Sequence, residues 1–556
     1  MRMVPSEFAK LHDKRGTATR SKRKSTSHVA HMSVPLKGLS RLAQLNEADP
    51  LLASILTNFV VEQDRITLRP GYFRMGAITP GRPISTLIPF YGSGSAPTLI
   101  AAAGDGLFNA SGTRIGTHSY GSDAWSWTSF ANLSQTKYTV MVNGIDGIIA
   151  WDGTTTSLPA MLDLSGHPDD FKGLPEVDPN GLQRLEIDIR ALPPGFDQNK
   201  LDKVLAHQNR LWFANSTDLA VYYLPIQVLS GTMGILPLNA YFRRGGAIRA
   251  IMTWTYTGGA GMDDLLAIFS TNGEAAIYQG SNPDAVDGSF KLVGIYRFDT
   301  PMASGCTVNY GGELYVLIGT GLVPMSTLLK AEEDNLGVAD QNIMQEFSDI
   351  SKTFRDNYGW SVIINSQTNH AICNMPLGSG QYQQLVRFMP NPIWSKWSNI
   401  PSRCWAWLSN YAYFGTEDGR ICRSGREYLN DDGKPINVDV RFAWSSFKSV
   451  NKKQFKMIRL YMMSDSIPQP FVDVEVDYQN IPPTNQPEAA QVNTAALWNT
   501  ATWDVDGWAI DAVPRQQWLG VVGLGRVGAP RIRASFTGST FSLTGADVIY
   551  EEGGLM

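Results

Sequence analysis

The chain has 556 residues, of which 43% are hydrophobic and 18% are charged, and its formal net charge is −4. This is the composition of an ordinary globular protein, long enough for several domains or for one large all-β unit with additions. Four cysteines without CxxC spacing exclude a disulfide scaffold, and no apolar run approaches the roughly 18 residues that a membrane span needs. We therefore expect reduced, buried thiols and a protein that folds in a reducing cytosol.

The N-terminal 24 residues are strongly basic. They contain eight Lys or Arg and two acidic residues, so they carry +6 and the remainder of the chain −10. The segment lacks a signal-peptide apolar core, and 14–27 lacks the apolar face of a transit peptide. We interpret 1–40 as a basic N-terminal arm, which is either a solvated tail or a contact for nucleic acid or an acidic partner, with His28 and His31 solvated.

Residues 41–74 form a lead-in segment in front of the main repeats. Leu39 to Leu56 has the apolar spacing of a short helix. The stretch ILTNFVVEQDRITLRPGYF, residues 55–73, indicates two strands that are separated by a polar break and end in Arg-Pro-Gly. Nothing in it is catalytic, so we expect 55–73 to pair with a distant part of the chain or with another chain.

From residue 75 to 435 the chain repeats one pattern, in which a polar turn precedes a strand rich in Leu, Ile, Phe, Tyr or Trp and another turn follows. The repeats begin at residues 105, 143, 208, 271, 311, 366 and 411. The six intervals average about 51 residues, close to the length of a four-stranded propeller blade. We predict an all-β fold with a six-bladed β-propeller-like body over 75–435, interrupted by a proline-rich loop insertion at 159–200.

After residue 436 the strands become longer and alternate between apolar and polar residues, as in INVDVRFAWSSF and FVDVEVDYQ. This pattern predicts a C-terminal β-sandwich platform over 436–556. A second short helix is predicted between 329 and 354. Four tryptophans in the platform are interpreted as packing residues: Trp498, Trp503, Trp508 and Trp518.

Two glycine-rich motifs imitate ligand-binding signatures. GLGRVG at 523–528 has the letters of a dinucleotide fingerprint, but Pro530 and a strand follow where the fingerprint needs a helix. GGAGMDD at 258–264 lacks the Lys-Ser/Thr of a P-loop and the alternating ligands of an EF-hand. We interpret both as turns, with a bound ion as the alternative at 258–264 and a type I′ turn at Asn272-Gly273.

We find no active site and expect no cofactor, no metal site and no enzymatic activity. The seven histidines show no nucleophile-elbow or metal-ligand context, and His370 lies three residues before Cys373 without a second ligand pair. A propeller glycosidase would need paired carboxylates over the central channel. The candidate carboxylates all lie beside glycine or in turns, where Asp forms turns: Asp105, Asp146, Asp152, Asp263, Asp264, Glu274 and Asp418.

Residues 208–283 resemble the tail hub, or nozzle, protein of short-tailed bacteriophages, also called the packaged-DNA stabilisation protein. The resemblance rests on the order and spacing of Asn209-Arg210-Leu211, Tyr223-Leu224-Pro225, Arg244-Gly245-Gly246, Trp254 and Tyr278-Gln279-Gly280. The stretch TNFVVEQDRITLRPGY near the start and GADVIYEEGGLM at the end resemble the same family, whereas the basic residues 1–31 have no counterpart in it.

The resemblance implies that the chain is a structural protein of the virion, and that it is made and assembled in the host bacterial cytoplasm. Such proteins form a homohexameric ring below the portal and adaptor, extend the DNA channel and retain the genome until ejection. The implied partners are further copies of the chain, portal-adaptor proteins, tail fibre or spike proteins, and packaged DNA that passes without sequence specificity. No stable membrane insertion is expected. The family also implies that 55–73 joins the C-terminal platform to the propeller.

Two other functions stay open at this point. A carbohydrate-active propeller, either a glycosidase or a lectin, would show a carboxylate pair at the channel mouth and monomeric behaviour. A phage receptor-binding or tail-spike component would show an exposed aromatic groove for sugars and trimeric assembly.

Overall fold

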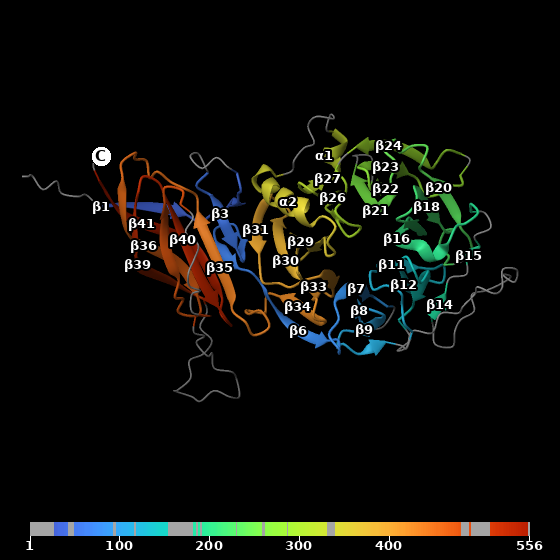
Figure 1. The fold of residues 1–556 in the computed structure, drawn as a ribbon, viewed down its shortest axis with the longest axis horizontal. Helices are drawn as coiled ribbons and strands as arrows, with labels where there is room; N and C mark the ends of the chain where they lie inside the picture. Colours follow the sequence, from blue (N-terminus) through green and yellow to red (C-terminus); the bar gives the residue numbers. More distant parts are fainter. Residues whose placement is uncertain are drawn as a thin grey trace, which may run out of the picture.

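The computed structural model describes residues 27–42, 49–92, 96–115, 118–153, 182–184, 187–188, 192–229, 231–257, 262–285, 287–297, 299–330, 340–479, 489–490 and 512–553. Strands dominate these residues, and they form a ring of small sheets beside a two-sheet platform (Figure 1). The predicted all-β class, propeller-like body and C-terminal β-sandwich are confirmed.

The ring begins with five sheets built from consecutive strands, because short apolar runs alternate here with Gly, Asn and Asp turns. The first two sheets comprise β7 (Ile84–Phe90), β8 (Thr98–Ala103), β9 (Gly106–Asn109) and β10 (Arg114–Ile115), then β11 (Ser126–Ala131), β12 (Lys137–Val142), β13 (Ile148–Trp151) and β14 (Leu182–Arg184). The third comprises β16 (Leu201–His207), β17 (Arg210–Asn215), β18 (Ala220–Tyr223) and β20 (Gly234–Pro237), while β15 (Ile187–Asp188) pairs with β19 (Gly231–Thr232) beside it. The fourth and fifth comprise β21 (Ile248–Thr257), β22 (Met262–Ser270), β23 (Glu274–Gln279) and β24 (Lys291–Arg297), then β25 (Thr307–Tyr310), β26 (Glu313–Ile318) and β27 (Gly321–Pro324).

Two further sheets complete the ring. The sixth comprises β28 (Ser361–Asn365), β29 (His370–Gly378), β30 (Gln381–Phe388) and β31 (Ile393–Trp397). The seventh comprises β32 (Cys404–Leu408), β33 (Tyr411–Gly415), β34 (Arg420–Gly425) and β6 (Gly71–Ala77). The first strand of the seventh sheet, β32, packs against β7 of the first, so the ring is closed.

The described residues therefore form seven sheets around the ring, one more than the six blades expected. The seven repeated sequence runs fall one in each sheet, on β9, on β13 and its turn, and on β17, β23, β26, β29 and β33. The prediction counted the six intervals between runs, whereas a closed ring has as many blades as it has runs.

Strand β6 closes the ring because it comes from the lead-in segment rather than from the end of the repeats. It runs antiparallel to β34, from Gly71 opposite Gly425 to Ala77 opposite Arg420. The expected domain boundary between residues 74 and 75 is therefore wrong, since it cuts this strand. An N-terminal strand in the last blade ties the two ends of the ring together by hydrogen bonds.

The platform consists of two packed sheets. One has the order β39 (Val513–Gly525), β36 (Lys453–Ser464), β41 (Phe541–Glu552), β5 (Ile66–Leu68) and β4 (Phe59–Val61), with β1 (Ser27–Ser33) also on β41. The other continues from β31 through β3 (Leu52–Thr57), β35 (Ile436–Phe442), β40 (Gly528–Phe536) and β37 (Phe471–Val476), with β2 (Gly38–Leu39) on β3 and β38 (Ala489–Ala490) on β40. One apolar core fills the space between them, including Phe59, Val440, Leu460, Ile532 and Leu543. The alternation of buried and exposed residues along β35 and β36 follows from this one-sided burial.

The lead-in segment passes through both modules. Strand β3 pairs with β31 of the sixth propeller sheet and with β35 of the platform, and β5 pairs with β41 of the other platform sheet. The helix expected over Leu39 to Leu56 is wrong where the structure describes it, since β2 and β3 occupy the two ends. Residues 27–39 of the expected arm form β1 and β2, so this part of the arm belongs to the platform.

Helices are few among the described residues. Helix α1 (Met325–Lys330) follows β27, and α2 (Gln341–Phe354) buries Ile343, Phe347 and Ile350 in the large core. The second predicted helix is therefore present in part, as α2. Most of the expected insertion at 159–200 lies outside the described residues, while its 182–184 portion is β14 of the second sheet and not a loop.

Candidate functional site

The junction between propeller and platform is centred on a buried arginine. Arg69 lies between β5 and β6, and its side chain is 0% exposed. Its guanidinium donates to Oδ1 of Asn58 at 2.9 Å, to both carboxylate oxygens of Asp431 at 2.9 and 2.6 Å, and to the carbonyls of Pro70 at 2.9 Å and Ser398 at 3.0 Å. All five N–H groups of a guanidinium are thus satisfied.

These partners come from three different parts of the fold. Asn58 links β3 to β4, and its side-chain amide donates to the carbonyl of Asn437 at 2.6 Å and to Oγ of Ser398 at 3.1 Å. Ser398 follows the sixth propeller sheet, Asn437 lies on β35 of the platform, and Asp431 follows the closing sheet. Asn58 has φ +61°, a left-handed conformation that Asn tolerates better than most residues. Arg69 therefore bonds directly to residues that follow two propeller sheets and, through Asn58, to β35 of the platform.

Asp431 is the charge partner of Arg69 and is 3% exposed. Burial raises the pKa of its carboxyl above the usual value, and the Arg69 guanidinium opposes that rise. A buried ion pair of this kind contributes little net stability but is expensive to break, because either charge alone would be buried without a partner.

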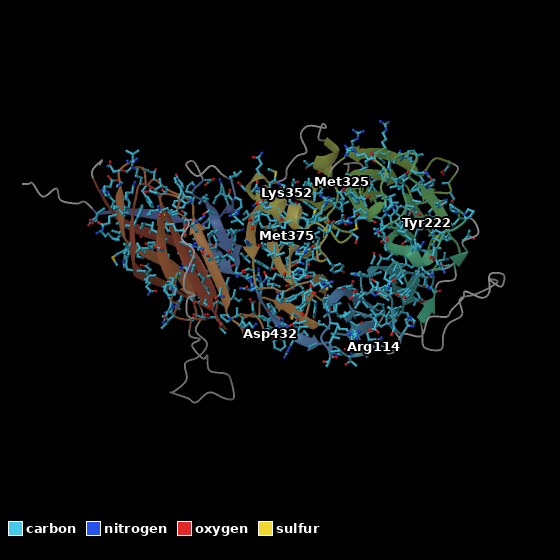
Figure 2. The ribbon with its side chains drawn as sticks, in the orientation of Figure 1. Arg114, Tyr222, Met325, Lys352, Met375 and Asp432 are labelled. Carbon is cyan, nitrogen blue, oxygen red and sulfur yellow. The ribbon has the colours of Figure 1, made fainter. Side chains whose placement is uncertain are left out.

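Gly71 allows the chain to turn from this junction into β6. A Cβ at Gly71 would lie 2.1 Å from the carbonyl oxygen of Asn430, and the neighbouring Tyr72 pairs with Asp431 through a β-bridge. The residue after Asp431, Asp432, marks the position of the junction in the ring. It lies on the side of the ring that faces the platform, as Met375 does, whereas Tyr222 lies on the opposite side (Figure 2). The Arg-Pro-Gly-Tyr sequence thus supplies the ion pair, the turn and the first residues of the closing strand.

A cavity of about 270 Å³ lies beside the junction and is lined by residues of both modules, including Arg65, Leu68, His370, Trp397 and Phe541. His370 is 8% exposed, and burial lowers its pKa to about 4. It is therefore a neutral core histidine near neutral pH, and its chain neighbour three residues on, Cys373, is a buried free thiol.

The platform is stabilised by a second set of buried charges. Arg531 on β40 donates to Asp439 at 2.6 Å and to Glu475 at 2.7 Å, and Arg441 donates to the other oxygen of Glu475 at 2.6 Å. The hydrogen bond to Asp439 is the largest reason why the pKa of Arg531 is raised. The four side chains connect β35, β40 and β37 across the sheet.

The N-terminal strand β1 is held to β41 by side chains as well as by its backbone. Nδ1 of His31 is 2.8 Å from Oδ1 of Asp547, whose other oxygen accepts hydrogen bonds from Arg459 and from Tyr461 at 2.6 Å. Burial opposes ionisation of Asp547, but these hydrogen bonds prevail and lower its pKa to about 2. His28 stacks on Tyr550. Both histidines are exposed, as expected, and in addition each contacts a side chain of β41.

The carboxylates considered for glycoside hydrolysis lie in several turns and, for Asp263, Asp264 and Glu274, on strands β22 and β23. Asp105 accepts from Arg82 and Ser119, and Asp146 accepts from the backbone N–H of Gly121 at 2.8 Å. No hydrogen bond between described side chains joins any two of the predicted candidates. Asp418 bonds within its own turn, to Thr416 and Arg420, whereas Asp264 accepts from Thr255 on the neighbouring strand and Glu274 accepts from the N–H groups of Arg243 and Arg244. The side chain of Asp263 lies outside the described residues.

The glycine-rich motifs are parts of hairpins. Residues 523–528 span the two-residue turn between β39 and β40, so no helix follows them. The described part of 258–264 is the start of β22, and residues 258–261 lie outside the described residues. The type I′ turn expected at Asn272-Gly273 is wrong. Gly273 has φ +80° while Asn272 is not in the left-handed region, which is the geometry of a three-residue loop.

The remaining expectations concern metal sites, membrane-spanning helices and the tryptophans of the platform. No group of His, Cys, Asp or Glu within the described ranges has the arrangement of a metal site, and no helix there is long and apolar enough to cross a membrane. Trp518 on β39 faces Arg459 at 4.8 Å from its ring centre. The three other tryptophans singled out in the platform, Trp498, Trp503 and Trp508, lie outside the described residues.

Sequence reasoning identified Arg69 as part of a motif but missed its partners. Asp431 lies in an Asn-Asp-Asp-Gly turn that looks like any other solvated turn. The available signal was indirect, since an arginine between two strand-like runs has to be solvated or paired.

No family model matches the chain, and no curated protein matches it. Among solved structures, the computationally designed protein Ika8 is 11% identical over 66% of this chain and 96% of its own, with a TM-score of 0.33. The β-propeller domain of Cps50 (Swd1) from Myceliophteria thermophila is 12% identical over 64% of this chain and 99% of its own, with a TM-score of 0.35. The extracellular domain of the hybrid two-component system BT3049 from B. thetaiotaomicron is 11% identical over 84% of this chain and 61% of its own, with a TM-score of 0.38. Because these TM-scores are below 0.5, the fold assignment rests on the strand pairing described above.

Proposed function

We propose that this chain is the tail hub, or nozzle, subunit of a short-tailed bacteriophage. In this proposal six copies form a ring below the portal and adaptor, extend the DNA channel and retain the genome until ejection. Portal-adaptor proteins and tail fibre or spike proteins are its neighbours in the virion, and DNA passes without sequence-specific contacts. It acts as a structural protein and not as an enzyme.

The lead-in segment is the observation that carries the proposal. A single stretch, 52–77, pairs with both platform sheets and then closes the propeller, and the buried Arg69–Asp431 pair lies at its centre. Such a construction couples two β-modules into one stiff block. Stiffness of this kind suits a subunit that must transmit load within an assembly, and the sequence resemblance includes this same segment.

The overall charge is compatible with a channel through which DNA slides. The chain beyond its basic N-terminal 24 residues carries −10. An acidic or neutral wall repels the phosphate backbone, whereas a basic wall would hold DNA electrostatically. We therefore propose sliding rather than binding for the DNA contact.

The first test measures whether the protein is a fixed component of the particle. Particles of the source phage are treated with nuclease, washed and analysed by quantitative mass spectrometry of this chain against the major capsid protein. A constant low ratio that matches one ring per particle supports the proposal. Absence from washed particles overturns it.

A second test addresses the lead-in segment. A phage that lacks this gene is complemented with the wild-type chain, with a chain lacking 55–73, or with Arg69→Met. Loss of the first variant from particles is expected, as is reduced incorporation of the second relative to the control Arg65→Met, whose ion-pair partner Asp64 is 65% exposed. Normal incorporation of the deletion variant would contradict the coupling role.

The carbohydrate-active alternative is favoured by one observation, a cavity at the propeller axis that is lined with aromatic and basic side chains. Asp356 is the carboxylate among the described residues that line it, so a pair for glycoside hydrolysis is not present within that set. Within this alternative the cavity therefore favours a lectin, which binds a sugar without hydrolysing it, over a glycosidase.

A further inference from the structure

The platform sheet that contains β41 has two edges at which no further strand pairs within the part of the chain that the structure describes. On one side β39 pairs with β36 alone, and on the other β1 pairs with β41 alone. These strands lie at the end of the platform that is farthest from the propeller (Figure 1). The outer side of such an edge strand presents backbone N–H and C=O groups that can pair with another chain.

The two edges contain few of the charges and prolines that usually prevent such pairing. Strand β39 has 13 residues, and its one charged residue and its one proline, Arg515 and Pro514, lie near its start. Strand β1 contains two histidines but no Lys, Arg, Asp, Glu or Pro. A register shift against β36 follows Gly520, so Val513–Gly520 is the regular part of the β39 edge.

An apolar row on the outer face of this sheet reaches from one edge to the other. Val29 on β1 lies opposite Ile549 on β41, and Met457 on β36 lies between Ile549 and Gly520 of β39. Val29 is 63% exposed and Met457 is 37% exposed. A Cβ at Gly520 would have no atom within 4 Å, so the row ends at β39 in open space. Outward-facing positions of a sandwich are normally polar, so an apolar row that reaches both edges indicates a contact surface.

A second copy of the chain fits both edges at once. Strands β1, β41, β36 and β39 are each antiparallel to the next, so β1 and β39 run in opposite directions. A rotation about an axis along the strands preserves these directions and would bring β1 of one copy beside β39 of the next as an antiparallel pair. The cross-strand rows would then continue between copies, with Val29 opposite Gly520 and His31 opposite Trp518.

Charge disfavours the other simple arrangement, in which two copies of β39 pair with each other. Arg526 lies in the exposed turn after β39, and neither it nor Arg515 forms an ion pair with a described carboxylate. Antiparallel pairing of β39 with itself would bring Arg515 of one copy close to Arg526 of the other. Like charges on opposed strands are destabilising.

The head-to-tail arrangement places Arg526 near carboxylates instead. It lies at the end of the sheet where β41 finishes in Glu551 and Glu552. Lys456 is 3.7 Å from Glu551, whereas the buried Lys453 donates to three backbone carbonyls. Among the described residues of one copy, the two carboxylates thus have one cation within ion-pair distance, and Arg526 of the next copy would supply another.

We propose that copies of this chain associate head to tail through β1 and β39, so that the outer platform sheet continues from copy to copy. The contact deepens the ring proposed above and rests on it for the number of copies alone. The composition of the particle tests the virion role and the association of the purified chain tests this contact, so the failure of one is distinguished from the failure of the other.

Sedimentation equilibrium of the full chain over a range of protein concentrations measures the association. Val29→Lys places a charge in the apolar row, and Val293→Lys, at a 48% exposed position on β24 of the propeller, is the matched control. Association about tenfold weaker in Val29→Lys and unchanged in Val293→Lys is expected, because an apolar contact between copies is lost. A wild-type chain that stays monomeric at every concentration, or equal association of the two variants, would overturn the proposal.

Cysteine cross-linking tests which strands meet. The four native cysteines are buried free thiols, so introduced cysteines react selectively. Directly opposed residues of paired strands are close enough for a disulfide, so mild oxidation of Val29→Cys/Gly520→Cys should give a ladder of linked dimers, trimers and larger species. Each single variant and the control pair Val293→Cys/Gly520→Cys should give no ladder.

Two outcomes of the cross-linking would contradict the head-to-tail contact. One is the absence of a ladder in Val29→Cys/Gly520→Cys. The other is efficient dimer formation by Gly520→Cys alone, which would show that two β39 strands meet. Circular dichroism confirms that each variant is folded before it is oxidised.

Discussion

Replacing Arg69 by methionine tests whether the junction holds the two modules together. The substitution keeps an unbranched apolar side chain but removes every hydrogen bond of the guanidinium. Asn58 keeps a donor on its side-chain oxygen, because the N–H of Ser398 also donates to it at 2.8 Å. Asp431 loses both charged donors while its side chain is 3% exposed, and the Pro70 carbonyl loses its arginine donor.

The magnitude follows from the burial of the pair. Removing one partner of a buried ion pair costs about 3–5 kcal/mol, because the other charge is left without compensation. Arg65→Met is the control in the same segment, since Arg65 pairs with Asp64, whose side chain is 65% exposed. Pairs of that kind contribute about 0–1 kcal/mol. Arg69→Met should therefore lose several kcal/mol more than Arg65→Met.

The pH dependence of the loss has a definite sign. Burial already raises the folded-state pKa of Asp431 above 3.8, and removal of Arg69 raises it further. A carboxyl with a raised folded pKa favours the folded state below its unfolded pKa and loses that advantage as the pH rises through the folded value. The deficit of Arg69→Met should thus be smaller near pH 4 than near pH 7.

Urea unfolding followed by tryptophan fluorescence gives the free-energy difference, and hydrogen exchange of residues 52–77 gives the local effect. We expect faster exchange in β6 and β3 of Arg69→Met at pH 7. In Arg69→Met/Asp431→Leu the orphaned charge is absent, so most of the stability should return. Equal losses in Arg69→Met and Arg65→Met, or a deficit that grows toward acid, would refute the reasoning.

Three further predictions concern other residues. Asp547→Asn should increase hydrogen exchange in β1, and the stability contributed by Asp547 should be present above pH 3.8 and lost as the pH falls through about 2, measured as the difference between the two acid-unfolding curves. His370 has a folded-state pKa of about 4 against an ordinary 6.5, so its contribution is complete above pH 6.5 and lost toward pH 4, and His370→Phe should flatten the stability curve across that window. Gly71→Ala places a Cβ 2.1 Å from the backbone of Asn430 and should cost about 1–3 kcal/mol in urea unfolding, whereas Gly520→Ala, with no atom within 4 Å of its Cβ, should cost less.

The sequence predicted the parts of the fold that local pattern determines. Turn residues and apolar runs located one strand in each of the seven sheets, and alternation located β35 and β37 of the platform. Pattern could not show that β6 belongs to the last sheet, because its partner β34 is more than 300 residues away. It also mistook 39–56 for a helix, since apolar spacing over a short stretch fits both periodicities and the two buried residues of β3, Ala53 and Leu56, are three positions apart.

Site residues were harder to predict than strands for a physical reason. Asp431, Asn58 and Ser398 acquire their role from the closure of the ring, which brings a lead-in residue to the last sheet and to the platform at once. The cavity at the propeller axis arises in the same way, because six of the seven sheets each supply only a few residues at or just before the start of an inner strand. A propeller spreads any central site over the whole chain at intervals of one blade, so no local motif can mark it. Closure by β6 therefore determines the rigidity of the junction, because the segment that pairs with β34 also carries Arg69 and its bonds to Asp431.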